Sequence, residues 1–416
     1  MTQACGVDFG TSNSTVGWHR AGQPALLALE NSNTTLPSVV FFNAEDDKIS
    51  YGRAALANYL AGYEGRMMRS MKSLLGTSLM DGQTEVLGRA LPFRALLGQF
   101  ISELKRRAEA SAGRSFERAV LGRPVHFIDD NPQADQLAEN TLREIALDAG
   151  FREVAFQFEP IAAAFEYESH INREELVLIA DIGGGTSDFS LVRLGPDRAG
   201  RPDRRDDILG NAGVHLGGTD FDKYLSLSSV MPLLGLGSRL KNNGEMPSSH
   251  YFNLATWHTI NLAYIPRAER ELQDLQRDAL EPEKLAVLLK LIRDRAGHWL
   301  ALRVEEGKIL LSDTATAELD LPRMSPSQKL VLERERFNSA IGPLTESVES
   351  TVRGLLRDAD LGSQSVDTVF FTGGSSGVPL LRERIAAVVP NARRVEGDLF
   401  GSIGAGLALD AARRFG

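Results

Sequence analysis

The chain has 416 residues, of which 43% are hydrophobic and 24% charged, and its formal net charge is -9. This length is too great for one hydrophobic core, so two or three domains are expected, and the negative charge argues against nucleic acid or an anionic membrane as a partner. The single cysteine, Cys5, excludes a disulfide framework or a thiolate metal cluster within the chain. We expect a cytoplasmic protein, because no apolar run is long enough to span a bilayer and residues 1–5 lack the pattern of a signal peptide.

The first part of the chain alternates strand and helix patterns, separated by residues typical of turns. Short runs of apolar and β-branched residues predict strands at 4–9, 15–19, 25–29, 38–42, 119–124 and 154–158. Longer apolar-periodic runs predict helices at 54–60, 91–112 and 131–150, with a fourth helix after Pro160. This order is typical of a βαβ-like unit.

The second part restarts the same pattern. Strands are predicted at 176–181, 187–194 and 366–371, and helices over much of 220–312, 325–357 and 401–414. Residues 195–205 are rich in Gly, Pro and charge, which predicts an exposed loop.

We therefore predict an α/β protein built from two duplicated lobes. Lobe I spans 1–172 and is completed by 395–416, and lobe II spans 173–394. Each lobe is expected to carry an extra subdomain, at about 37–92 in lobe I and at about 226–312 in lobe II.

Two segments share one pattern, in which an Asp ends an apolar run and a Gly turn with hydroxyl side chains follows. They comprise Asp8, Gly10, Thr11, Ser12 and Asn13 in the first segment, and Asp181, Gly183, Gly184, Gly185 and Thr186 in the second. A tight Gly hairpin frees backbone N–H groups to bind an anion, and the Asp beside it can hold a hydrated Mg²⁺. A single Gly turn is most often only a turn, but two matching copies predict a site that grips a polyphosphate from both sides.

Four further segments strengthen this interpretation, although each has a simpler reading. Gly217 and Gly218 precede Thr219 and Asp220, which are residues typical of a helix N-cap, and such a start also offers N–H groups to phosphate. The Gly373-Gly374-Ser375 turn follows a strand and allows close approach of a base or sugar. Lys72 by itself is typical of a surface lysine, and Glu159 by itself is stabilised by the helix start that it occupies.

Together these segments resemble the ATPase domain of the seventy-kilodalton heat-shock chaperones of the DnaK type, within the actin and sugar-kinase superfamily. The strings Val7-Asp8-Phe9-Gly10-Thr11, Asp181-Ile182-Gly183-Gly184-Gly185-Thr186, Glu159-Pro160-Ile161-Ala162-Ala163-Ala164, His215-Leu216-Gly217-Gly218-Thr219-Asp220-Phe221-Asp222 and Gly373-Gly374 carry the resemblance. It spans nearly the whole chain and implies an actin-like fold with a nucleotide cleft between the lobes. Because the chain stops after the expected last helix of that domain, it is most similar to short YegD-type members, without a peptide-binding domain.

The resemblance also implies roles and cofactors. Lys72 would stabilise the γ-phosphate and the attacking water, Glu159 would orient that water, and Thr186 would contact the γ-phosphate. Asp8 and Asp181 would hold Mg²⁺, largely through water. ATP or ADP would contact Gly10, Thr11, Ser12, Asn13, Gly183, Gly184, Gly185, Gly217, Gly218, Glu305, Lys308, Ser312, Gly373, Gly374, Ser375 and Asp398. The implied chemistry is slow ATP hydrolysis by positioning and charge stabilisation.

The sequence departs from the family's pattern at two cleft positions. The family usually has an Arg that stacks on adenine where this chain has Gly377, and an Asn where this chain has Ile128. The first departure removes a cation–π contribution on the order of 1 kcal/mol and predicts weaker adenine binding or a relaxed base preference.

The resemblance implies an unfolded polypeptide or another protein as partner, with co-chaperones of the J-domain or exchange-factor kind, and neither nucleic acid nor a membrane. Three alternatives stay open on the sequence. These alternatives are a nucleotide-dependent scaffold or regulator with little turnover, a small-molecule kinase with Glu159 as base, and a filament-forming relative of actin.

Overall fold

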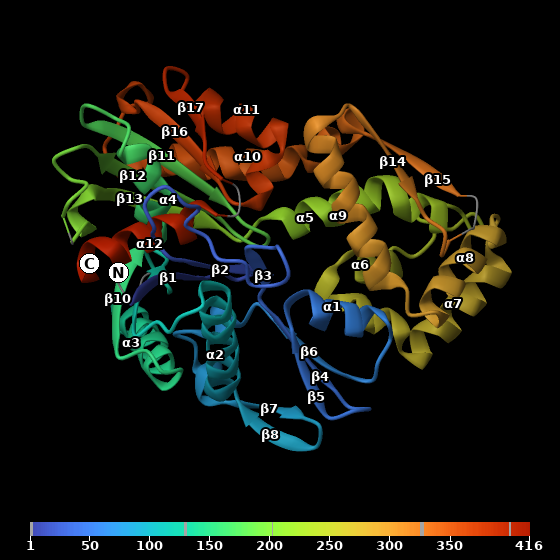
Figure 1. Ribbon diagram of the computed structural model, residues 1–416. Helices are drawn as coiled ribbons and strands as arrows, with labels where there is room; N and C mark the ends of the chain where they lie inside the picture. The colour runs from blue at the N-terminus through green and yellow to red at the C-terminus, as the bar shows by residue number, and fades with distance from the viewer. Residues whose placement is uncertain (1–2, 129–130, 202, 325–327, 399–400) are drawn as a thin grey trace.

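The computed structural model describes residues 3–128, 131–201, 203–324, 328–398 and 401–416. Two five-stranded sheets form the centre of the molecule, with strand orders β10-β9-β1-β2-β3 and β13-β12-β11-β16-β17 (Figure 1). The first sheet consists of β1 (Ala4–Phe9), β2 (Asn13–Gly17), β3 (Thr35–Pro37), β9 (Arg118–Arg123) and β10 (Glu153–Phe158). The second consists of β11 (Glu175–Ile182), β12 (Ser187–Leu194), β13 (Ile208–Val214), β16 (Thr368–Thr372) and β17 (Arg393–Glu396).

The two sheets repeat one arrangement of strands. In each, an antiparallel hairpin (β1 with β2, β11 with β12) is joined by a parallel strand (β9 or β16) on the other edge of its first strand. Buried apolar side chains fill β1 and most of β11, as strands covered on both faces require. The predicted duplication of a strand–hairpin–strand unit is therefore present in the structure.

Helices α4 (Glu159–Glu168) and α12 (Ser402–Phe415) lie between the two sheets (Figure 1). Helix α12 packs on β1 and on α4, and small residues allow this close crossing. A Cβ atom on Gly406 would lie 2.6 Å from the carbonyl carbon of Ala162, so the helix backbones nearly touch. One buried cluster combines Ile161 of α4 and Leu407 of α12 with Ile179 of the second sheet, and this shared core joins the two halves.

Other helices cover the outer faces of the sheets. They are α2 (Phe93–Ala112) and α3 (Pro132–Asp148) beside the first sheet, and α10 (Arg334–Asp358) and α11 (Pro379–Val388) beside the second. Helix α2 ends at Gly113 in the left-handed conformation, and Asn131 caps α3 by accepting a hydrogen bond from the Ala134 N–H, 3.0 Å. Every helix in the described part of the chain is too short or too polar to serve as a transmembrane span.

Two smaller groups of elements extend from the sheets. The first comprises β4 (Val39–Asn43), β5 (Lys48–Tyr51), α1 (Gly52–Leu60), β6 (Gly65–Arg69), the 3-10 turns Met71–Leu74 and Ser78–Asp81, β7 (Gln83–Val86) and β8 (Arg89–Pro92). The second comprises α5 (Gly218–Leu225), α6 (Ser249–Ala255), the 3-10 segment Trp257–Tyr264, α7 (Pro266–Asp278), α8 (Pro282–Arg293), α9 (Gly297–Asp313), β14 (Thr316–Asp320) and β15 (Lys329–Glu333). These groups include the segments 37–92 and 226–312, and the division into subdomains stays a prediction.

The two groups contact each other through an aromatic clasp formed by Tyr59, His298, Trp257 and Arg69. The rings of Tyr59 and Trp257 pack edge-on against His298, with centroids 4.8 and 4.9 Å away, and Arg69 lies over Trp257 at 4.7 Å. The Tyr59 hydroxyl also donates to the side-chain oxygen of Asn261, 3.2 Å. Burial lowers the pKa of His298 to about 4, so its ring is neutral at pH 7.

Three sequence expectations differ from the structure. Residues 25–29 contain a single isolated bridge, from Leu26 to Gly17, rather than a strand. Residues 329–333 of the predicted helix 325–357 are strand β15, because their alternating apolar and polar residues pair with β14; residues 325–327 lie outside the described part. Most of loop 195–205 is exposed as expected, with residue 202 outside the described part, but Arg204 is fully buried and pairs with Glu168 and Asp207.

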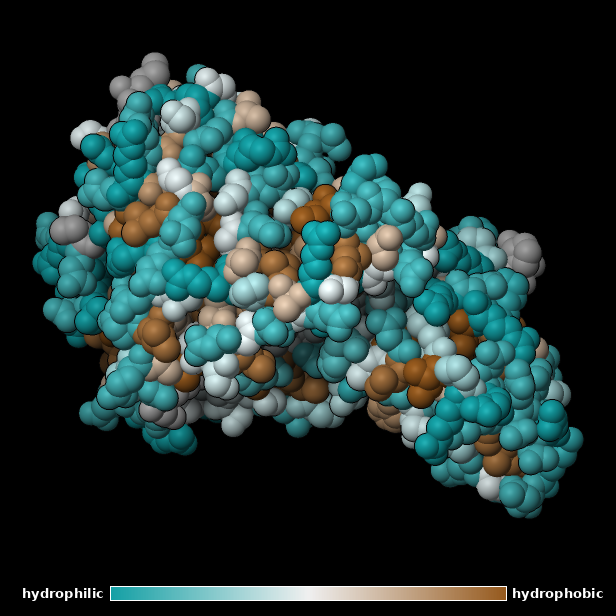
Figure 2. Space-filling model, turned by 90° about the horizontal axis from the view of Figure 1, so that it is seen from below, coloured by the Kyte–Doolittle hydropathy of each residue, from teal (hydrophilic) through white to brown (hydrophobic). Residues whose placement is uncertain are grey.

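The surface view in Figure 2 shows hydrophobic residues in small separate groups among hydrophilic ones. That face offers no single broad apolar surface.

Candidate active site

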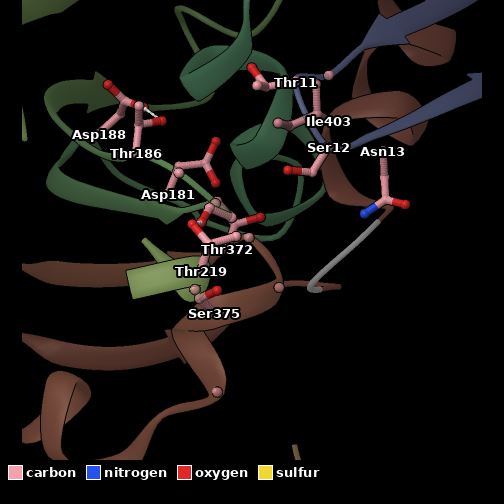
Figure 3. A pocket seen from close by; sticks show the side chains of 18 of the residues that line it. Thr11, Ser12, Asn13, Asp181, Thr186, Asp188, Thr219, Thr372, Ser375 and Ile403 are labelled. Carbon is pink, nitrogen blue, oxygen red and sulfur yellow. Dashed lines mark hydrogen bonds between the residues drawn. The ribbon is translucent and has the colours of Figure 1, made fainter. Parts of the chain in front are cut away.

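The turns of two β-hairpins, one from each large sheet, face each other. A Cβ atom on Gly184, in the β11–β12 turn, would lie 2.6 Å from the Ser12 hydroxyl of the β1–β2 turn. Figure 3 shows Thr11 and Ser12 on one side of the pocket and Asp181 on the other. The two predicted anion-binding turns therefore meet across one cleft, although 171 residues separate Asp181 from Gly10 in the sequence.

Local hydrogen bonds fix the shape of each turn. Ser38 holds the first turn, because its hydroxyl donates to the Gly10 carbonyl, 2.6 Å, and its N–H donates to the Ser12 carbonyl, 2.8 Å. In the second turn, the Gly183 N–H donates to the Thr186 carbonyl, 2.9 Å. Hydrogen bonds within the chain thus hold both turns in place.

A lysine and several carboxylates gather at the floor of the cleft, beside the two turns. Lys72, on the 3-10 turn after β6, forms an ion pair with Glu159 at the start of α4. Burial raises the pKa of Asp8 to about 7, and repulsion by Glu159 adds to the rise while Lys72 opposes it. Burial likewise raises the pKa of Asp181 to about 8, with repulsion from Asp188 and two other carboxylates.

The pKa of Lys72 stands above its ordinary value. Burial by itself lowers this pKa, but Glu159 and the two aspartates at the ends of β1 and β11 outweigh it. The cleft therefore holds a permanent cation within a surplus of negative groups. Such a surplus favours binding of a further cation or loss of a negative charge to protonation.

Helix α5 starts against the second turn. The Gly218 N–H donates to the Gly183 carbonyl, 3.0 Å, and the Thr219 hydroxyl donates to the Gly184 carbonyl, 2.8 Å. The N-cap position belongs to Gly217, whose N–H is bound by the Asp220 carboxylate at 3.0 Å, rather than to Thr219 or Asp220. This contact fixes the start of α5 beside the second turn.

Lys308 links α9 to this helix start. Its ammonium donates to the Gly218 carbonyl, 3.1 Å, and pairs with Asp222, 2.9 Å. Burial raises the pKa of Asp222 to about 6, while Lys308 opposes the rise. The predicted ligand contact Lys308 therefore also holds α9 and α5 together.

The strand β16 ends in a turn that lies directly against Asp181. Gly373 has a φ of +81°, and a Cβ atom there would lie 2.5 Å from the Ile182 carbonyl oxygen and still closer to the Asp181 carboxylate. Only glycine combines this conformation with this approach. The Ser376 hydroxyl closes the turn by donating to the Gly373 carbonyl, 2.8 Å.

These elements enclose a cleft of about 1340 Å³. All but two of the predicted site residues line it. Those that line it are Asp8, Gly10, Thr11, Ser12, Asn13, Lys72, Glu159, Asp181, Gly183, Gly184, Gly185, Thr186, Gly218, Glu305, Lys308, Ser312, Gly373, Gly374 and Ser375. Gly217 lies behind the second turn and Asp398 lies on an exposed segment before α12, and neither is part of the lining.

The cleft has polar lining residues that the sequence reasoning gave no role. Asp188 accepts a hydrogen bond from the Thr186 hydroxyl, 3.0 Å (Figure 3), and Asp222 pairs with Lys308. Asp222 belongs to a string that carries the resemblance, and Asp188 follows another such string by two residues, so both positions were visible in the sequence. Arg69 and Trp257, from the clasp, also line the cleft and gave no sequence signal.

A family model described as Hsp70 protein matches residues 4–229 and 291–410 of the chain. The chain belongs to the Hsp70 family. This membership confirms the predicted family and the actin-like ATPase fold. Members of the Hsp70 family generally bind ATP or ADP and hydrolyse ATP, and typically bind polypeptides and co-chaperones.

The match to the Hsp70 family leaves residues 230–290 uncovered. This segment contains α6 and α7, most of α8, and the Trp257–Tyr264 segment, which holds Trp257 of the clasp and Asn261, the acceptor of the Tyr59 hydrogen bond. The residues that form the facing turns and the Lys72–Glu159 pair all lie inside the matched part. Of the four clasp residues, Trp257 lies in the uncovered segment, whereas Tyr59, Arg69 and His298 lie inside the matched part.

Proposed function

We propose that the chain binds Mg-ATP and hydrolyses it slowly, as a chaperone-like ATPase. The observation that carries this proposal is the Lys72–Glu159 ion pair placed beside two facing anion-binding turns. Contact with a phosphate group during the reaction cycle would explain why Lys72 lies at this position. Family membership supports the same reading.

The proposed mechanism assigns each group a physical task. The N–H groups and hydroxyls of turns 10–13 and 183–186 hold the polyphosphate from both lobes. Glu159 accepts a hydrogen bond from the attacking water and orients it, and Lys72 offsets the charge that develops on the γ-phosphoryl oxygens. Thr186 contacts the same group, and its hydroxyl would turn from Asp188 to do so. Because the donors are ordered by local hydrogen bonds, little reorganisation is needed during the reaction.

The residues present suit a hydrated Mg²⁺. Asp8 and Asp181 are acidic groups whose pKa values burial raises to about 7 and about 8, so a divalent cation would relieve an unfavourable charge arrangement. Within the described residues, no three His, Cys, Asp or Glu side chains are arranged to ligate a metal directly. This agrees with an ion held through water and phosphate oxygens, where it would neutralise phosphate charge.

The base end of the cleft favours a second candidate, a nucleotide-dependent regulator with little turnover. Gly377 leaves that wall without a side chain, and a Cβ there would make only ordinary contact with Ser312, 3.6 Å. The nearby Arg382 is committed to the Ser376 carbonyl and to Glu396. Weak binding of the base would let the bound nucleotide exchange faster than it is hydrolysed. The partner that reads the nucleotide state would be a polypeptide or another protein, and the setting would be the cytoplasm.

Measurement of phosphate release with Mg-ATP, for the wild type and for Glu159→Gln, tests the proposal. Calorimetry on the same samples gives nucleotide affinity. We expect the variant to bind ATP within about threefold of the wild type but to release phosphate on the order of 100-fold more slowly, as loss of a positioned general base predicts. Binding of ATP with equal, negligible phosphate release by both proteins would instead support the regulator.

Stimulation separates the remaining classes. An unfolded peptide that accelerates phosphate release supports the chaperone-like role. A sugar or other small alcohol that does so, with phosphate transferred to it, supports a kinase, and ATP-dependent light scattering that grows with protein concentration supports a filament.

A further inference from the structure

Arg123, the last residue of β9, is a buried cation directly behind the active site. Its side chain is only 7% exposed, and it pairs with Asp135, 2.7 Å, and with Glu139, both on α3. Its guanidinium also donates to the carbonyls of Pro124, 3.0 Å, and Val125, 3.2 Å. One side chain therefore satisfies two carboxylates and two backbone oxygens, far more than a solvated arginine needs.

These contacts shape the segment 124–128, which lines the cleft. The Asp135 carboxylate that binds Arg123 also accepts a hydrogen bond from the Phe127 N–H, 2.6 Å. The Arg123 guanidinium lies over the Phe127 ring, 5.2 Å from its centroid. The segment is thus fixed at its start by carbonyl contacts and at its far end through Asp135.

The same segment supports the strand-to-turn region that carries Lys72. A Cβ atom on Gly76 would lie 2.7 Å from the Ile128 side chain and 3.0 Å from the Ala134 carbonyl oxygen. Residue 76 follows the 3-10 turn Met71–Leu74 by two positions. A shift of segment 124–128 would therefore press on the backbone that positions the lysine.

Arg123 also supports Glu159 from the opposite side. In the parallel pairing of β9 with β10, Arg123 stands opposite Phe158, the residue before Glu159. The guanidinium lies over the Phe158 ring at 5.3 Å. Arg123 therefore contacts both segment 124–128, which supports the backbone near Lys72, and Phe158, which precedes Glu159.

We propose that Arg123 is a positioning residue for hydrolysis. It keeps Lys72 and Glu159 in the correct relative position by holding segment 124–128 and Phe158. The inference rests on the proposed ATPase function. Arg123 does not reach the cleft itself in this role; it acts through the two groups. Loss of its fork of hydrogen bonds lets those groups drift, and misplacement by about 1 Å can cost roughly 100-fold in rate.

Arg204 provides a matched control. It too is a fully buried arginine bound to two carboxylates, Glu168 and Asp207, and packed over an aromatic ring, Phe165. It lies outside the residues that line the cleft. Replacement of either arginine removes a buried cation from a similar setting, so the two variants should lose comparable stability.

The experiment compares Arg123→Lys, Arg123→Met and Arg204→Met with the wild type. Single-turnover ATP hydrolysis, nucleotide affinity and urea unfolding are measured on each protein. We expect both Arg123 variants to lose at least about tenfold in the hydrolysis rate with affinity changed less than about threefold, since lysine keeps the charge but not the planar fork. Arg204→Met should hydrolyse ATP at the wild-type rate at temperatures where it is folded.

Two results would overturn the inference. One is an Arg123→Lys protein that is folded and hydrolyses ATP at the wild-type rate. The other is an Arg204→Met protein that loses as much rate as Arg123→Met at equal stability, because the effect would then be one of general folding. A wild type that binds but never hydrolyses ATP would instead refute the proposed function, so the two failures are distinguishable. Should Arg123→Met not fold, the lysine variant alone decides.

Discussion

Replacement of Gly406 by alanine tests the helix crossing on which the joined lobes depend. Helix α12 passes α4 so closely that a Cβ atom on Gly406 would meet the backbone of Ala162, 2.6 Å from its carbonyl carbon and closer still to its oxygen. Helix propensity alone predicts the opposite result, because alanine is favoured over glycine in a helix interior by about 0.8–1.0 kcal/mol. The sign of the stability change therefore separates the two effects.

The magnitude follows from the distance. Carbon atoms in comfortable contact are about 3.5–4.0 Å apart, and the Ala162 oxygen is closer than its carbon, so the two helices would have to separate by at least about 1 Å. The obstacle is backbone rather than the end of a flexible side chain, which places the cost near the upper end of the usual range for overpacking, about 3 kcal/mol. After the gain in propensity, Gly406→Ala should lose about 2 kcal/mol of unfolding free energy.

Gly98 is the matched control, because it also lies inside a helix, α2, but a Cβ there has open space around it. Gly98→Ala should gain up to about 1 kcal/mol. Urea unfolding of both variants and the wild type measures the difference, which should be about 3 kcal/mol. A Gly406→Ala protein as stable as Gly98→Ala would refute the crossing described here. Because Glu159 begins α4, Gly406→Ala should also slow hydrolysis.

Three further predictions follow from the cleft. Burial and neighbouring carboxylates raise the pKa of Asp181 from 3.8 to about 8, so the folded protein keeps a proton that the unfolded chain releases, and stability falls as pH rises from about 4 to about 8. In urea unfolding without nucleotide, Asp181→Asn should therefore lose less stability between pH 5 and pH 8 than the wild type. An equal loss in the two proteins would contradict the raised pKa. Tyr59→Ala removes an aromatic contact of about 0.5–1.5 kcal/mol from the clasp and should speed nucleotide dissociation about 2- to 13-fold in stopped flow, whereas the exposed Tyr63→Ala should not. A Cβ at position 377 would make only ordinary contact with Ser312, so Gly377→Arg can be accommodated there. The arginine should strengthen ADP binding, measured by calorimetry, by about 0.5–2 kcal/mol. Unchanged ADP affinity would show that the base lies elsewhere.

Much of the cleft could be predicted because its parts are local in sequence. Each anion-binding turn needs only a strand end, glycines and hydroxyls within a few residues, and these follow Asp8 and Asp181 directly. The approach of the two turns depends on the duplicated sheets, which the repeated pattern indicated. The ion pair of Lys72 with Glu159 joins residues with no shared local pattern. The family resemblance implied a role for each residue but did not predict the pair.

Other features could not be predicted because long-range packing decides them. Arg204 lies in a segment whose composition is typical of an exposed loop, yet Glu168, 36 residues earlier, draws it into the core. Strand β15 was read as helix because its five residues gain their pairing only from β14. Strands β13 and β17 were missed because each is a short or glycine-containing edge strand with only one partner. Asp398 was assigned to the site by resemblance, and the structure places it outside the lining of the cleft.

Single-turnover hydrolysis of ATP with Mg²⁺ by the wild type and by Lys72→Ala, alongside nucleotide affinity by calorimetry, tests the central claim most directly. Lys72 meets Glu159 between the two anion-binding turns, so its loss should remove charge stabilisation in the transition state more than in the ground state. The account predicts that hydrolysis falls on the order of 100-fold or more while affinity changes by less than about tenfold. A Lys72→Ala protein that hydrolyses ATP at the wild-type rate, or a wild type that fails to bind ATP, would contradict it.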